Sequence, residues 1–98
     1  EIRGLSLHVP TRRVTVSARH IDLTASEYAL LETLMLRADR VITRRFLEER
    51  IFGNKENLSN ALEVHMGNLR RKIGDGYVRT VRGVGYVIDT VSVQKVTG

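Results

Sequence analysis

The sequence predicts an α+β fold in which a small antiparallel sheet comes first, three helices follow and a β-hairpin ends the domain. Short alternating apolar segments before residue 23 indicate strands. Two segments then begin with helix N-cap patterns, and a third has helical apolar spacing. At 98 residues the chain is long enough for one small domain, so we expect a single domain over 1–98.

The first 23 residues have the pattern of several short strands. Apolar residues Leu5 and Leu7 precede a break at 10–12, and Val14 and Val16 precede a turn near 17–19. Pro10, the only proline, stands where a strand should end. Because aromatic residues make up only 5% of the chain, we expect a thin sheet that needs helices packed on one face.

The first helix begins with a capping-box pattern at Thr24 and Glu27. Its apolar residues continue through Met35, and the pattern fades near 37–39. Because Leu30 and Leu36 widen the apolar surface, we expect little of this helix to face water and assign it as the central scaffold.

The second helix begins after Thr43, an N-cap residue, and is expected to end near 52–53. Ile42 is placed to contact Leu47 across this start. Arg44 and Arg45 occupy the first turn, where the helix dipole disfavours cations, so we expect an anion such as phosphate nearby. The alternative is two solvated arginines.

The third helix has a core stripe and an unusual outer face. Its apolar positions share one sector of the helical wheel: Leu62, Met66, Leu69 and Ile73. The opposite sector holds Asn60, Val64, Gly67, Asn68 and Arg71. A glycine inside a helix costs roughly 1 kcal/mol relative to alanine, and close approach of a groove wall is one reason to tolerate it.

The outer residues of this helix match base edges of DNA. Valine can contact a thymine methyl, asparagine can pair with N6 and N7 of adenine, and Arg71 can bind guanine or a phosphate. The alternative is a merely solvated face, since single exposed apolar residues are common.

The third helix is expected to end at 74–76. A hairpin follows, with strands over 77–82 and 86–90 and a turn at 83–85. The polar loop 53–58 joins the second and third helices into a helix-turn-helix with a long connector. No motif is recognisable in 91–98.

Composition favours an anionic partner. Lys and Arg number 16 against 11 acidic residues, which gives a net charge of +5 and favours nucleic acid or anionic lipid. The absence of cysteine excludes disulfides and thiolate metal sites. No apolar run reaches the roughly 20 residues that cross a bilayer, so we expect a soluble cytoplasmic domain without membrane contact. Because the chain does not begin with Met, we expect it to be part of a longer protein.

Four segments together resemble the winged-helix DNA-binding domain of response-regulator transcription factors of the OmpR/PhoB type. They are LTASEYALLETL, VITRRFLEERIFG, SNALEVHMGNLRRKIG and VRTVRGVGYVI. The segment EVHMGNLRRKI is also similar to the corresponding segment of the PmrA/QseB branch of this family. The resemblance implies a bacterial two-component response regulator whose output domain binds specific double-stranded DNA and controls transcription. The helix from Leu58 to Ile73 would enter the major groove, and the hairpin would form a wing in an adjacent minor groove.

The resemblance also assigns site residues. It makes Val64 and Asn68 base contacts and places Arg82, at the wing tip, in the minor groove. Phosphate contacts are assigned to Arg44, His65, Arg70 and Thr80. Helix position and charge add Arg71 to the base contacts and Arg45 and Lys72 to the phosphate contacts. Many relatives have arginine or another large polar residue in place of Gly67, arginine in place of Asn68 and tryptophan in place of Phe52, so fewer cationic base contacts are expected here.

The family pattern further implies partners. A receiver domain would precede this one, and none of it lies in this chain. Two copies would bind tandem direct-repeat half-sites as a dimer. Loop residues Asn54, Lys55 and Glu56 would face RNA polymerase, the alternative being a plain connector.

Two other classes of function compete with DNA binding. A winged helix can dock another protein, in which case Arg71 and Arg82 would be dispensable. An enzyme is disfavoured because His8, His20 and His65 are far apart and lack metal-ligand spacing, so no catalytic residue, metal or cofactor is predicted. RNA binding is disfavoured because the basic face lacks stacking aromatics.

Overall fold

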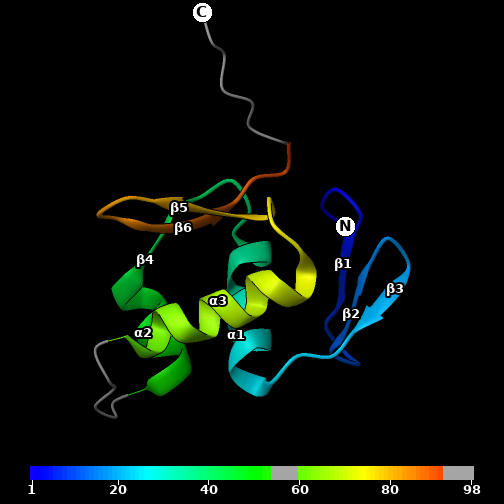
Figure 1. The fold of residues 1–98 in the computed structure, drawn as a ribbon, viewed down its shortest axis with the longest axis horizontal. Coiled ribbons are helices and arrows are strands. Elements are labelled where there is room, and N and C mark those ends of the chain that lie inside the picture. The colour runs from blue at the N-terminus through cyan, green and yellow to red at the C-terminus, as the bar shows by residue number, and fades with distance from the viewer. Residues whose placement is uncertain (54–59, 92–98) are drawn as a thin grey trace, which may run out of the picture.

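The computed structural model describes residues 1–53 and 60–91. The elements in chain order are β1 (Leu5–His8), β2 (Arg13–Val16), β3 (Arg19–Ile21), α1 (Ala25–Leu36), β4 (Ile42–Thr43), α2 (Arg44–Phe52), α3 (Ala61–Ile73), β5 (Val78–Val81) and β6 (Gly85–Ile88). Two small sheets lie on different sides of the three helices (Figure 1). The predicted α+β class and element order are therefore confirmed.

The N-terminal sheet is antiparallel in the order β1-β2-β3. Val16 pairs with Arg19, and the two residues between them, Ser17 and Ala18, have φ values of 50° and 69°. Positive φ at both central residues is the type I′ geometry that suits a tight hairpin. Leu5 and Val14 are buried, so one face of this sheet packs on the core, as predicted.

The capping box of α1 is formed. The Glu27 backbone N–H donates to Thr24 Oγ1 over 3.2 Å, and the Thr24 N–H donates to Glu27 Oε1 over 2.9 Å. The helix ends at Leu36 and contacts α2, α3 and β6, which confirms it as the scaffold. The expectation that little of it faces water is wrong at its end, because Leu36 is 64% exposed.

The second sheet contains a strand that the sequence pattern did not predict. Ile42 and Thr43 form β4 and pair antiparallel with Tyr86 and Gly85 of β6, so the order is β4-β6-β5. Thr43 still caps α2, since its Oγ1 accepts from the Phe46 N–H over 3.1 Å. This strand fixes the start of α2 against the hairpin.

The hairpin strands are shorter than predicted, and Gly85 belongs to β6 rather than to the turn. An ideal Cβ at Gly85 would lie 1.9 Å from the Ile42 carbonyl oxygen. The close approach of β4 therefore requires glycine at this position.

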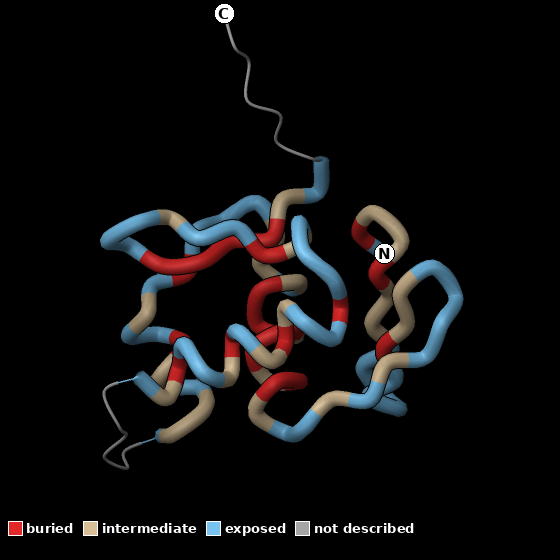
Figure 2. Tube along the Cα trace, in the orientation of Figure 1, coloured by how far each residue is buried: buried red, intermediate tan, exposed pale blue. Residues whose placement is uncertain are grey.

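Helix α3 begins at Ala61, later than the implied Leu58, with Asn60 as its N-cap residue. Because Asn60 precedes the helix, it is not part of the predicted outer face. Its side chain makes no cap hydrogen bond. The core stripe is confirmed, because its four members are buried: Leu62, Met66, Leu69 and Ile73. Figure 2 shows β6 as a continuous buried stretch, whereas burial alternates along α3.

Candidate nucleic-acid interface

The outer face of α3 carries a shallow, open depression with a volume of about 680 Å³, called the concave surface below. It is lined by Glu63, Val64, Gly67, Asn68, Arg70, Arg71, Gly74 and Asp75. Three predicted base-contacting residues, Val64, Asn68 and Arg71, are thus brought together. Val64 is 52% exposed, so its isopropyl group is available to a partner.

Gly67 lies in the middle of this surface. Apart from its chain neighbours and the backbone of α3 itself, no atom of the described residues lies within 4 Å of the position that a Cβ would occupy, so their packing does not require glycine there. The missing side chain leaves the backbone of α3 open to an approaching surface.

Asn68 and Arg71 interact within the same surface. Arg71 Nη2 donates a hydrogen bond to Asn68 Oδ1, across the i,i+3 spacing that brings helix side chains together. The pairing of these two residues was not anticipated from the sequence.

Arg70 joins α3 to the hairpin. Its Nη2 donates to the Val78 carbonyl oxygen over 3.1 Å and to Thr80 Oγ1, and its guanidinium lies 5.5 Å from the ring centroid of Tyr86. Two predicted phosphate-contacting residues, Arg70 and Thr80, are therefore adjacent. The contacts hold the hairpin at a defined position beside α3.

Arg44 meets a carboxylate of the chain itself. Arg44 Nη2 lies 2.9 Å from Glu63 in the first turn of α3 and 3.9 Å from Glu48. The hydrogen bond that Arg44 donates to Glu63 raises the pKa of Arg44 despite partial desolvation. Within the chain, the anion beside this arginine is Glu63, which was not among the predicted site residues. The assignment of Arg44 as a phosphate contact stays a prediction. The sequence signal that could have indicated this partner is an acidic residue in the first turn of α3.

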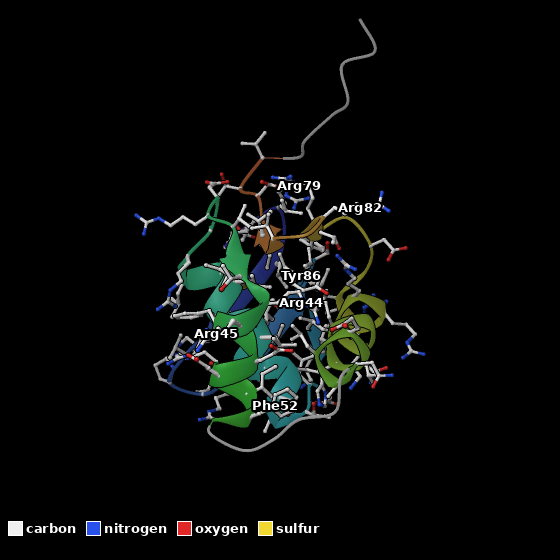
Figure 3. All side chains as sticks on the ribbon, turned by 90° about the vertical axis from the view of Figure 1, so that its left-hand side faces the viewer. Arg44, Arg45, Phe52, Arg79, Arg82 and Tyr86 are labelled. Atoms are coloured by element: carbon white, nitrogen blue, oxygen red, sulfur yellow. The ribbon has the colours of Figure 1, made fainter. Side chains whose placement is uncertain are left out.

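Arg44 also lies next to the hairpin. Its backbone N–H donates to the Val84 carbonyl oxygen over 3.4 Å, and Figure 3 shows its side chain near Tyr86. Arg82 lies in the exposed turn of the same hairpin (Figure 3). The start of α2, the first turn of α3 and the hairpin therefore meet around Arg44.

Arg45 and His65 have different surroundings. Arg45 forms an exposed pair with Glu49 at 3.4 Å, an arrangement that contributes little to stability. The ring centroids of His65 and Phe52 lie 6.0 Å apart, so α2 and α3 are also in contact near the end of α2. Their assignment as phosphate contacts stays a prediction.

Lys72 is not brought to the concave surface. Its ammonium lies 2.7 Å from Glu27 Oε1 at the start of α1, and this carboxylate satisfies the charge within the chain. Its assignment as a phosphate contact stays a prediction. The three predicted loop residues, Asn54, Lys55 and Glu56, lie outside the described residues.

The histidines of the described ranges have separate neighbours. His8 Nδ1 lies 2.7 Å from Thr11 Oγ1, and His20 Nε2 lies 2.8 Å from Asp22. Across 1–53 and 60–91, no three side chains of the metal-ligating types form a group that could hold an ion. Within the same residues, no helix is both long and apolar enough to cross a bilayer.

A helix-turn-helix whose second helix carries an open outer face, followed by a hairpin held against that helix, defines a winged-helix domain. The N-terminal sheet places it with the winged-helix domains of OmpR/PhoB type. The chain belongs to the family described as "Transcriptional regulatory protein, C terminal", whose family model matches residues 18–88.

Its relatives are bacterial regulators. The chain is 44% identical over 86 residues to the response regulator protein PmrA of Pseudomonas aeruginosa, covering 87% of this chain and 39% of PmrA. It is 44% identical over 92 residues to the transcriptional regulatory protein QseB of Haemophilus influenzae, covering 93% and 42% respectively. It is 52% identical over 86 residues to the swarming motility regulation protein RssB of Serratia marcescens, covering 87% and 39%. The chain thus spans about two fifths of each relative.

Solved structures share the fold. The DNA-binding domain of CpxR from E. coli has a TM-score of 0.81 at 26% identity, covering 93% of this chain and 96% of that one. The DNA-binding domain of the response regulator AdeR, solved in complex with an intercistronic region, has a TM-score of 0.82 at 25% identity, covering 91% and 97%. The predicted fold and family are confirmed.

Proposed function

We propose that this chain binds specific double-stranded DNA as the output domain of a two-component response regulator that controls transcription. Helix α3 enters the major groove, and the turn between β5 and β6 reaches an adjacent minor groove. The observation that carries the proposal is the concave outer face of α3, which collects Val64, Gly67, Asn68 and Arg71 on one open surface. Such a helix is of the size that the major groove admits.

The residues divide into base and phosphate contacts. Val64, Asn68, Arg71 and Arg82 contact bases. Phosphates are held by Arg44, Arg45, His65, Arg70, Lys72 and Thr80. Arg44 and Arg70 are already held in place by Glu63 and Thr80, so less side-chain entropy is lost when DNA binds. The net charge of +5 supplies the salt-dependent part of the affinity.

The wider setting is also a proposal. Two copies bind tandem direct-repeat half-sites as a dimer, and the loop with Asn54, Lys55 and Glu56 faces RNA polymerase. The domain works in the cytoplasm, has no enzymatic activity and follows a receiver domain. The names of the relatives, which are response and transcriptional regulators, support a role in transcription regulation. The half-site arrangement, the dimer and the polymerase contact rest on the family resemblance.

A titration with fluorescent duplexes tests the function. One duplex carries a sequence selected from a random pool, and the control carries a shuffled version of it. We expect tighter binding to the selected duplex and an affinity that falls steeply between about 50 mM and 200 mM salt. Equal affinity for both duplexes, or an affinity independent of salt, contradicts the proposal and favours protein docking.

A further inference from the structure

We infer that Asn68 and Arg71 act together as a donor-rich unit that selects guanine, not adenine, at the base pair facing Asn68. The inference rests on the proposed DNA binding and adds which base the outer face of α3 prefers. It starts from the hydrogen bond between Arg71 Nη2 and Asn68 Oδ1.

The chemistry of the pair fixes the orientation of the amide. A guanidinium has five N–H donors and no acceptor. The Asn68 atom that faces Arg71 must therefore be the carbonyl oxygen, whichever way an amide is otherwise assigned. The Nδ2 amino group, the remaining guanidinium N–H groups and one lone pair of Oδ1 are left for a ligand, so donors outnumber acceptors.

Adenine and guanine differ in the group at position 6 that they present in the major groove. Adenine presents N7 as an acceptor and N6 as a donor, so an asparagine that pairs bidentately with it must accept the N6–H at Oδ1. Guanine presents N7 and O6, both acceptors. Arg71 occupies one of the two lone pairs of Oδ1, so the N6–H of adenine would have to share this oxygen with a guanidinium and would lie beside its positive charge. Both acceptors of guanine, by contrast, can be met by N–H donors of the pair.

The surroundings leave the pair accessible. Both residues line the concave surface, and Gly67 beside them contributes no side chain that could cover them. Glu63 lines the same surface, but its carboxylate is bound by Arg44 at 2.9 Å. Among the described residues, the Asn68 amide is the hydrogen-bond partner of Arg71, and both residues line the open surface.

Selection of bound duplexes from a random pool tests the inference with four proteins. They are the unaltered chain, Arg71→Ala, the double variant Arg71→Ala with Asn68→Ala, and Arg19→Ala as a control that removes one exposed positive charge from β3. The informative position is the one at which the double variant loses the preference of the unaltered chain.

We expect guanine at that position for the unaltered chain and for Arg19→Ala. In Arg71→Ala the freed Oδ1 should shift the preference to adenine by about tenfold, within the range of one bidentate base contact. The double variant should show no preference between the two purines.

Two outcomes overturn the inference while leaving DNA binding intact. One is adenine at that position for the unaltered chain. The other is loss of guanine in Arg71→Ala without a gain of adenine, because Arg71 would then read the base alone. If the unaltered chain enriches no sequence at all, the proposed function fails, and this inference fails with it.

Discussion

The Glu27 carboxylate at the start of α1 forms an ion pair with the Lys72 ammonium at the end of α3, with 2.7 Å between Oε1 and Nζ. The Glu27 side chain is only 3% exposed, and the same oxygen accepts the Thr24 N–H. Burial alone would raise the pKa of Glu27, but the hydrogen bonds from Lys72 and Thr24 and the charge of Lys72 together lower it. One carboxylate thus caps α1 and holds the last turn of the proposed recognition helix.

Stability should depend on pH through two carboxylates. The pKa of Glu27 is lowered from its ordinary value of 4.5, and hydrogen bonds from Arg79 lower the pKa of Asp89 from 3.8. A carboxyl group with a lower pKa in the folded state stabilises the fold above its unfolded pKa, and this contribution is lost as pH falls through the folded value. We therefore expect the free energy of unfolding to decline as the pH falls below about 4.5, measured by urea titrations at a series of pH values.

The variant Glu27→Gln isolates one of these contributions. It should be less stable than the unaltered chain at pH 7 and should lose less stability on acidification. An equally steep decline in both proteins would show that Glu27 does not contribute to the pH dependence.

Truncating Lys72 should destabilise the fold. Lys72→Ala removes a hydrogen-bond donor from a buried carboxylate, which costs about 1–3 kcal/mol in the free energy of unfolding. Urea titration at pH 7 measures the loss, with Arg19→Ala as the control for removal of one exposed cation. A cost no larger than in the control would contradict the structural role of the ion pair.

Lys72→Ala also tests the phosphate contact predicted for this residue. A phosphate contact predicts that the slope of log affinity against log salt falls by about 1. An unchanged slope together with lower stability would assign Lys72 to the Glu27 pair alone.

Gly67→Ala should separate stability from binding. Because the site of the new methyl group is open and alanine favours helix, the variant should gain up to about 1 kcal/mol in the free energy of unfolding. If DNA approaches α3 closely at this point, affinity for a selected duplex should nevertheless fall. Unchanged affinity would show that close approach is not the reason for this glycine.

Gly85→Ala is the counterpart of Gly67→Ala, because it adds the same methyl group at a closely packed glycine. Its Cβ would lie 1.9 Å from the Ile42 carbonyl oxygen, so β4 and β6 would have to separate. We expect a loss of about 3 kcal/mol, the upper range for overpacking. The same methyl group should thus have opposite effects at the two glycines, and a shared sign in urea titrations would contradict the described packing.

Arg82→Ala should weaken DNA binding without affecting the fold. Arg82 is exposed in the hairpin turn, so its truncation should change the free energy of unfolding by less than about 0.5 kcal/mol. A minor-groove contact predicts a loss of about 1–3 kcal/mol in binding and relaxed preference at the flanking base pairs. Binding selections with the variant measure both, and retention of full affinity and preference would exclude Arg82 from the interface.

Local sequence patterns determined much of this fold. The capping box at Thr24, the core stripe from Leu62 to Ile73 and the turn at Ser17 each depend on residues within a few positions of one another, and each is present in the structure. The open face with Val64 and Asn68 follows from the same helical period. Short-range geometry is sufficient for such features, because helix and hairpin periods relate neighbours in sequence to neighbours in space.

Contacts between distant segments were decided only by the tertiary structure. Strand β4 has two residues and exists because β6 pairs with it, and Gly85 is required only because Ile42 comes so close. The pairing of Lys72 with Glu27 spans 45 positions, and that of Arg44 with Glu63 spans 19. The sequence by itself determined which residues are charged and which helix face is open. The packing of α1, α2 and α3 decided which charges are satisfied within the chain, because ion pairs depend on distances that helical periodicity does not set.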